Sequence, residues 1–278
     1  MKNGLSGVKN LIWALAILLS LITLLVGLVF AMLTRYYGDR IDGTLVLGEG
    51  VSVSSGSGID NGGELQPGSS GTLMELPSTQ DNGIEALYNF TFLCDSTING
   101  INDYSASYGG NATAQLWTDD GSGLSAASAA TTSIVYPGDG SMITPSNAAM
   151  VAQPKRLVIY IGGDELASAT EDSFKAGYSQ LIAALRSASP DTKIICASIG
   201  SVSSAYPSSD GLNKDLIASA NGWIKDVAIE NQAYFADLAS ILNDGEGYLS
   251  AEFAGPDGRS LSSAGVAKLV EYFRFHGI

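Results

Sequence analysis

The chain has 278 residues, which could form one large domain or two small ones, and its 28 acidic residues outnumber its 14 lysines and arginines. With a net charge of −14 the chain has little to neutralise a row of phosphates, so the composition excludes a nucleic-acid-binding function. The acidity indicates a solvated, soluble surface, and a surface that faces cations or a cell wall is the alternative.

The first element is a run of 23 residues without a charged side chain, residues 11–33. About 20 apolar residues are enough to cross a bilayer as a helix, and Trp13 and Tyr36 lie where interfacial aromatic residues are expected. We therefore predict a short cytoplasmic tail over residues 1–10 and a transmembrane helix over residues 11–33. A cleaved signal peptide ending at Ala31 is the alternative, although its apolar part would exceed the usual length of roughly 7 to 15 residues.

The charges that flank this helix are nearly balanced, with Lys2 and Lys9 before it and Arg35 and Arg40 after it. The positive-inside rule therefore gives little guidance on orientation. A short tail followed by a large acidic domain favours the amino terminus inside. We predict a single-pass protein of the cell membrane with its domain on the extracytoplasmic side.

The next segment, residues 34–84, is rich in Gly, Ser, Asn and Asp, as in GEGVSVSSGSGIDNGG. A segment of this composition buries too little apolar surface to offset its ordering entropy, so it is typical of a flexible linker. The glycine-rich run lacks the Gly-Lys-Ser/Thr ending of a phosphate-binding loop, and no nucleotide is expected there. Residues 85–278 remain as the folded domain, which is long enough for a sizeable core.

Strand-like and helical segments alternate through this domain. The first strand, Phe90–Cys94, is mostly apolar and is followed at once by a polar turn that contains Ser96. Further strands are expected at 156–161, 193–198 and 233–238, and helices after the capping residue Thr170, over 212–231 and from Ser262 onward. Strands that alternate with helices predict a parallel sheet covered on both faces. Sites of such sheets lie at the carboxyl ends of the strands, where Ser96 is expected.

Four blocks occur in an order that resembles the SGNH (GDSL-like) hydrolase family: CDSTING, RLVIYIGGDE, AYFADL and DGRSLSSAG. The resemblance covers most of residues 85–278, and the sequence is similar to that of membrane-anchored clostridial-type members. It implies a flavodoxin-like three-layer α/β/α sandwich with a parallel sheet in the order 2-1-3-4-5. It also implies hydrolysis of esters, often acetyl or acyl groups on lipids and carbohydrates, without a cofactor.

The resemblance assigns roles to the site residues, and two of those roles have lost their chemistry. Ser96 takes the position of the nucleophile and Asp257 that of the acid that orients the catalytic histidine, but the histidine position is Ser260. A serine hydroxyl does not accept a proton at neutral pH, so Ser96 would attack unaided. Disabling such a triad removes a rate factor of about 10⁶, or about 8 kcal/mol of barrier lowering.

The second loss is at Asp164, which takes the position of the asparagine that donates to the oxyanion in the family. An ionised carboxylate accepts hydrogen bonds and would repel the developing negative charge. Asp95, Gly100 and Gly162 belong to the matched blocks, and we expect these residues, together with Asp164, to form the binding part of the cleft around Ser96.

His276, the only histidine of the chain, does not replace the missing base. It follows the start of the last helix by about 13 residues, and about 1.5 Å of rise per residue places it roughly 20 Å away. Hydrogen-bond reach is about 3 Å. We expect it to lie at a helix end, near exposed carbonyl groups.

The two cysteines, Cys94 and Cys196, are predicted to be free thiols. In the strand order that the resemblance implies, one strand separates them, or about 9 to 10 Å, whereas a disulfide needs Cα atoms within about 7 Å. Cys94 as a nucleophile is an alternative that would also lack a base. No metal site is predicted: there is no zinc constellation, and residues 119–121 are interpreted as a turn, with a calcium site as the alternative.

The sequence therefore favours a membrane-anchored, extracytoplasmic SGNH-like domain that is a degenerate esterase, or pseudoenzyme, binding a cell-envelope glycan or acylated ligand. One alternative is an active serine esterase with a rearranged base, Asp257 or Asp164 working through water. Another is a scaffold with an empty cleft that recruits a different envelope protein.

Overall fold

The computed structural model describes residues 71–98, 101, 115–121 and 123–278. The predicted tail, the predicted transmembrane helix and most of the predicted linker lie outside the described residues. In the part of the chain that the structure does describe, no helix combines the length and the apolar character needed to span a membrane.

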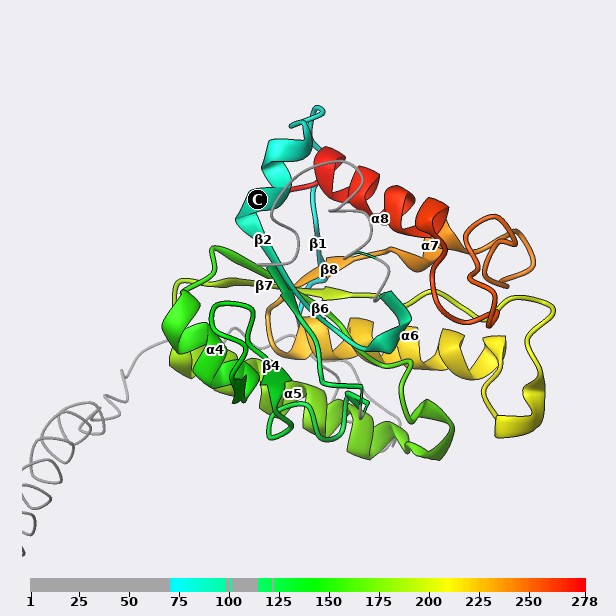
Figure 1. The fold of residues 1–278 in the computed structure, drawn as a ribbon, viewed down its shortest axis with the longest axis horizontal. Helices are drawn as coiled ribbons and strands as arrows, with labels where there is room; N and C mark the ends of the chain where they lie inside the picture. Colours follow the sequence, from blue (N-terminus) through cyan, green and yellow to red (C-terminus); the bar gives the residue numbers. More distant parts are fainter. Residues whose placement is uncertain (1–70, 99–100, 102–114, 122) are drawn as a thin grey trace, which may run out of the picture. The chain divides into compact units, whose positions relative to one another are not determined.

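A six-stranded parallel sheet forms the centre of the domain (Figure 1). Its strand order is β1-β8-β7-β6-β2-β3, which contains the expected order 2-1-3-4-5 with one further strand, β1, beside β8. The strands are β1 (Met74–Glu75), β2 (Phe90–Cys94), β3 (Leu116–Trp117), β6 (Arg156–Tyr160), β7 (Lys193–Ala197) and β8 (Tyr234–Ala236). The prediction of an α/β fold with a parallel sheet is confirmed.

Helices cover both faces of this sheet. In Figure 1, α4, α5 and α6 lie on one side of it and α7 and α8 on the other. Their bounds are α4 (Pro145–Ala152), α5 (Glu171–Ala188), α6 (Lys214–Glu230), α7 (Ala239–Leu242) and α8 (Ser263–Phe275). Short 3₁₀ helices are η1 (Ile84–Asn89), η2 (Ser96–Ile98), η3 (Leu166–Ser168) and η4 (Ser208–Asp210), and a small antiparallel pair joins β4 (Ile134–Val135) to β5 (Met142–Ile143).

Helix α5 shows why the expected helices form where they do. Thr170 caps it, because its hydroxyl accepts from the Ser173 backbone N–H, and the Ser173 hydroxyl is near the Thr170 N–H in return. Glu171 and Asp172 occupy the first turn, where negative charge suits the helix dipole. The apolar stripe of α5 is buried against the sheet.

The folded domain begins earlier than the predicted boundary at residue 85. Met74–Glu75 pairs in parallel with β8, and Leu76, only 3% exposed, is part of the core. Residues 71–84 therefore belong to the folded unit and not to the linker. The sequence did not indicate this strand because two residues are too short to show an alternating pattern.

Candidate functional site

The site is built where β2 and β6 end. Asp95 follows β2, is fully buried, and accepts hydrogen bonds from the backbone N–H groups of Thr97 (3.0 Å), Gly162 (3.1 Å) and Gly163 (2.7 Å). Burial, followed by the nearby charge of Asp164, raises the pKa of Asp95. Asp95 thus joins the loops that carry Ser96 and Asp164 and fixes their relative positions.

Gly163 is required by this close approach. A Cβ atom at Gly163 would lie 2.9 Å from the Thr97 methyl group and 3.2 Å from the Asp95 carboxylate, so a side chain would push the two loops apart. Gly162 was predicted to line the cleft, and the structure gives it a backbone role as a donor to Asp95. Gly100 lies outside the described residues.

Asp164 lies directly on Ser96. Its carboxylate accepts from the Ser96 hydroxyl (2.7 Å) and from the Ser96 backbone N–H (3.1 Å). The backbone N–H of Leu124, in the turn after β3, donates to the same carboxylate at 3.3 Å. Asp164 is 8% exposed, so these contacts form in a largely dehydrated position. In the alternative of an active esterase, Asp164 was expected to work through water, whereas here its carboxylate is bonded directly to the Ser96 hydroxyl.

Asp164 also contacts Arg259, from the turn before α8. Its guanidinium Nη2 pairs with the Asp164 carboxylate, and its Nε is buried without a hydrogen-bond partner among the described residues. Arg259 compensates the charge that Asp164 brings into the site. Arg259 was not predicted as a site residue, and its only signal in the sequence was its place inside the block DGRS.

Asp257 and Ser260 bond to each other. One Asp257 oxygen accepts from the Ser260 hydroxyl (2.7 Å), the Ser260 N–H (2.9 Å) and the Arg259 N–H (3.0 Å). Burial raises the pKa of Asp257, but these hydrogen bonds outweigh it, and the net pKa is lowered. In the described part of the chain, no hydrogen bond links either residue to Ser96. The carboxylate bonded to the Ser96 hydroxyl is that of Asp164.

His276 lies near the amino ends of the strands, whereas Ser96 lies at their carboxyl ends. It ends α8, stacks on Tyr272 with ring centroids 3.9 Å apart, and borders a cavity beside Phe90, the first residue of β2. Its Nδ1 is 2.8 Å from the Tyr272 carbonyl oxygen. The prediction that His276 lies at a helix end near a carbonyl group is confirmed.

The remaining candidates are structural. Cys94 and Cys196 are buried free thiols on β2 and β7, with β6 between them, as predicted. Burial, followed by the negative charge of Asp95, raises the pKa of Cys94 well above its usual value. Asp119 accepts from the Gly123 N–H and closes a turn. Within the described ranges, no cluster of three or more His, Cys, Asp or Glu side chains is arranged to hold a metal ion.

A protein family and several solved structures are similar to this chain. The model of the GDSL-like Lipase/Acylhydrolase family matches residues 92–268, more than half of the chain. No curated protein sequence matches it. Among solved structures, a GDSL-like lipase from Bacteroides thetaiotaomicron is 13% identical over 66% of this chain and 85% of its own, with a TM-score of 0.46.

A carbohydrate esterase family 3 structure from Talaromyces cellulolyticus is also 13% identical, over 66% of this chain and 93% of its own, with a TM-score of 0.42. The family assignment rests on the family match and on the ordered blocks around Ser96, Asp164 and Asp257. The chain belongs to the GDSL-like lipase/acylhydrolase family.

Proposed function

We propose that this GDSL-like domain has lost ester hydrolysis and binds a cell-envelope glycan or acylated ligand without turning it over. We further propose that residues 11–33 anchor it in the membrane with the domain on the extracytoplasmic side. The contact that supports the loss of hydrolysis is the one between the Asp164 carboxylate and the hydroxyl and N–H of Ser96.

An ester hydrolase needs free donors at the place where negative charge develops on the substrate oxygen. The N–H of Ser96 is next to the attacking hydroxyl and is suited to that task. In this protein it donates to a carboxylate instead, as does the hydroxyl itself. A substrate carbonyl would have to displace a charge-assisted contact, and the displaced carboxylate would then repel the oxyanion.

The second support is the missing base. Ser260, at the position where the family has histidine, donates its hydroxyl hydrogen to Asp257. It therefore acts as a donor within its own turn and cannot withdraw a proton from Ser96.

A direct contact nevertheless favours one alternative, an active esterase in which Asp164 is the base. The Ser96 hydroxyl is 2.7 Å from an Asp164 oxygen, within reach for proton transfer. Aspartate has an ordinary pKa of about 4, against about 6.5 for histidine, and is the poorer base at neutral pH. Its ion pair with Arg259 further ties up the same oxygen.

Hydrolysis of an aryl acetate by the full chain in detergent micelles distinguishes the loss of hydrolysis from an active esterase with Asp164 as its base. We expect wild type and Ser96→Ala to be equally inert. Asp164→Asn combined with Ser260→His should introduce activity that disappears when Ser96→Ala is added. An active wild type that is inactivated by both Ser96→Ala and Asp164→Asn would overturn the proposal in favour of the Asp164 base.

Ligand binding requires a separate measurement. We would titrate the full chain with an O-acetylated glycan and with its de-acetylated form, each beside Ser96→Ala. Binding that weakens in the variant, without release of acetate, supports a binding cleft. If neither glycan binds, the scaffold with an empty cleft becomes the better description.

The anchor is tested by alkaline carbonate extraction of membranes from cells that express the full chain. We expect the protein to stay in the membrane pellet and a deletion of residues 11–33 to release it. Recovery of the full chain in the soluble fraction would contradict the anchor.

A further inference from the structure

At the amino ends of the strands, opposite Ser96, two segments far apart in the sequence are joined by hydrogen bonds. The Thr79 N–H donates to the Phe275 carbonyl (2.6 Å), and the Asn82 N–H donates to the Arg274 carbonyl (3.0 Å). The Gly277 N–H donates to the Pro77 carbonyl at 3.1 Å. The segment before η1 and the end of α8 thus form one wall.

A cavity of about 520 Å³ lies between this wall, η1 and the first residues of β2 and β6. Its volume is within the range of roughly 300 to 1,000 Å³ that is usual for small-molecule sites. Ten of its eleven lining residues, six before residue 92 and four after residue 268, lie outside the part of the chain that matches the family. Most of the cavity lining therefore comes from residues on either side of the matched segment.

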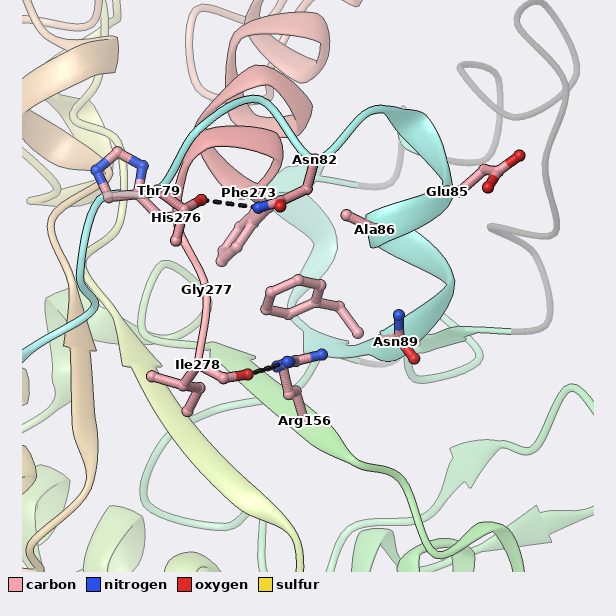
Figure 2. A pocket seen from close by; sticks show the side chains of 11 residues that line it. Thr79, Asn82, Glu85, Ala86, Asn89, Arg156, Phe273, His276, Gly277 and Ile278 are labelled. Atoms are coloured by element: carbon pink, nitrogen blue, oxygen red, sulfur yellow. Dashed lines mark hydrogen bonds between the residues drawn. The ribbon is translucent and has the colours of Figure 1, made fainter.

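Figure 2 shows how polar groups are arranged around it. Asn82 and Thr79, joined by a 2.7 Å hydrogen bond, lie on one side, and Arg156 lies across from them with its guanidinium on the Ile278 carbonyl oxygen. Asn89 is at the lower end of η1, near Arg156, and the Ala86 methyl group points toward the cavity. The rings of Phe90 and Phe273, 5.1 Å apart, close its base.

Several of these polar groups have unused hydrogen-bonding capacity. Within the described residues, the Asn89 amide and the Glu85 carboxylate have no hydrogen bond or ion pair. Arg156 uses Nε and Nη2 on Ile278 and stacks 5.3 Å above the Phe90 ring, which leaves Nη1 for a ligand. The site therefore offers an amide, a carboxylate and part of a guanidinium.

The charges of the lining residues decide which ligand class fits. Glu85 is the one acidic residue and Arg156 the one arginine or lysine among the eleven, so their formal charges cancel. Arg156 would attract an anion that Glu85 repels, and the reverse holds for a cation, so the two charges favour neither sign and suit a neutral ligand. Adjacent donors and acceptors match hydroxyl groups, each of which both donates and accepts.

We propose that this cavity binds a neutral saccharide, at a site separate from the Ser96 cleft. Binding here needs no catalytic residue, so it is independent of whether the Ser96 site hydrolyses or holds a ligand. A protein with two such sites would contact a polysaccharide at both the carboxyl and the amino ends of its strands.

Isothermal titration of the full chain in micelles with the N-acetylglucosamine tetramer tests the proposal. Ala86→Trp should block the cavity, and Asn89→Ala should remove one unpaired amide. We expect affinity to fall about tenfold or more in each variant. Matched controls are Ala218→Trp and Asn147→Ala, both at exposed helix positions away from the cavity, and these should bind like wild type.

The outcome also separates this site from the Ser96 cleft. Tetramer binding that survives Ala86→Trp and Asn89→Ala but is lost in Ser96→Ala would overturn the proposal and place the ligand in the cleft. Absence of binding by wild type would overturn the assignment of a neutral saccharide. A melting temperature for each variant, measured without ligand, excludes unfolding as the cause of a loss.

Discussion

The hydroxyl of Ser96 donates to the carboxylate of Asp164 across 2.7 Å, and the same carboxylate pairs with Arg259. The Asp164 carboxylate therefore binds both the hydroxyl of Ser96 and the guanidinium of Arg259. Because Asp164 is 8% exposed and Arg259 27%, the pair is partly shielded from water and should contribute to stability as well.

Arg259→Gln should destabilise the domain by about 1–3 kcal/mol, because it leaves the buried Asp164 carboxylate without its cation. Urea denaturation measures this change. The control is Lys268→Gln, which removes a pair with Glu271 whose side chains are 39% and 50% exposed, and there we expect less than about 0.5 kcal/mol. Equal effects of the two substitutions would show that the Arg259–Asp164 pair stabilises the domain no more than an exposed ion pair does.

Asp95 should make stability depend on pH in an unusual direction. Its pKa is raised by burial and by Asp164, so the folded state holds the proton more tightly than the unfolded state. The contribution of Asp95 is complete below its ordinary pKa of 3.8 and is lost as the pH rises through the raised pKa. The stability advantage of wild type over Asp95→Asn should therefore shrink from acidic to neutral pH in urea titrations. An advantage that grows with pH would show that the backbone donors outweigh burial.

The early start of the domain predicts a cost for Leu76→Ala. Leu76 is 3% exposed and lies just beyond β1, so the substitution should cost about 2–4 kcal/mol. Met74→Ala is the control, because Met74 is 36% exposed and should cost less than about 1 kcal/mol. If both substitutions are neutral, residues 71–84 do not contribute to the stability of the fold.

Two helix glycines should respond in opposite directions to alanine. A Cβ at Gly177 in α5 would lie 2.5 Å from the Ala127 backbone, whereas a Cβ at Gly222 in α6 meets nothing within 4 Å. Gly177→Ala should therefore destabilise by about 1–3 kcal/mol, and Gly222→Ala should stabilise by about 0.5–1 kcal/mol. Thermal melts of the two variants would check this, and a neutral Gly177→Ala would mean that the 125–129 turn gives way.

Both thiols should be inert in the folded protein. Burial raises the pKa of Cys196 to about 12 and that of Cys94 well above 9.0, so almost no thiolate forms at pH 8. We expect no reaction with Ellman's reagent in buffer and two thiols per chain in urea. Rapid labelling of the native protein would contradict the buried positions of both residues.

The sequence allowed strands β2, β6, β7 and β8 and helices α5, α6 and α8 to be predicted, because their alternation depends on local apolar patterns. Helices α4 and α7 were not predicted. It also placed Ser96, Asp164 and Asp257 at the carboxyl edge through block order. The role of Arg259 could not be predicted, because it depends on a contact 95 residues away in the chain. For the same reason, the direct bond between Ser96 and Asp164, 68 residues apart, was not predicted.

The pairing of β1 with β8, together with the bonds from Pro77 and Thr79 to the end of α8, sets the order in which the fold can be completed. During synthesis these early residues emerge first, yet their partners near Phe235 and Phe275 emerge last. β1 therefore stays unpaired until β8 has been made, and contacts this distant in sequence form slowly. Pulsed hydrogen exchange during refolding should find the Leu76 amide among the last to be protected.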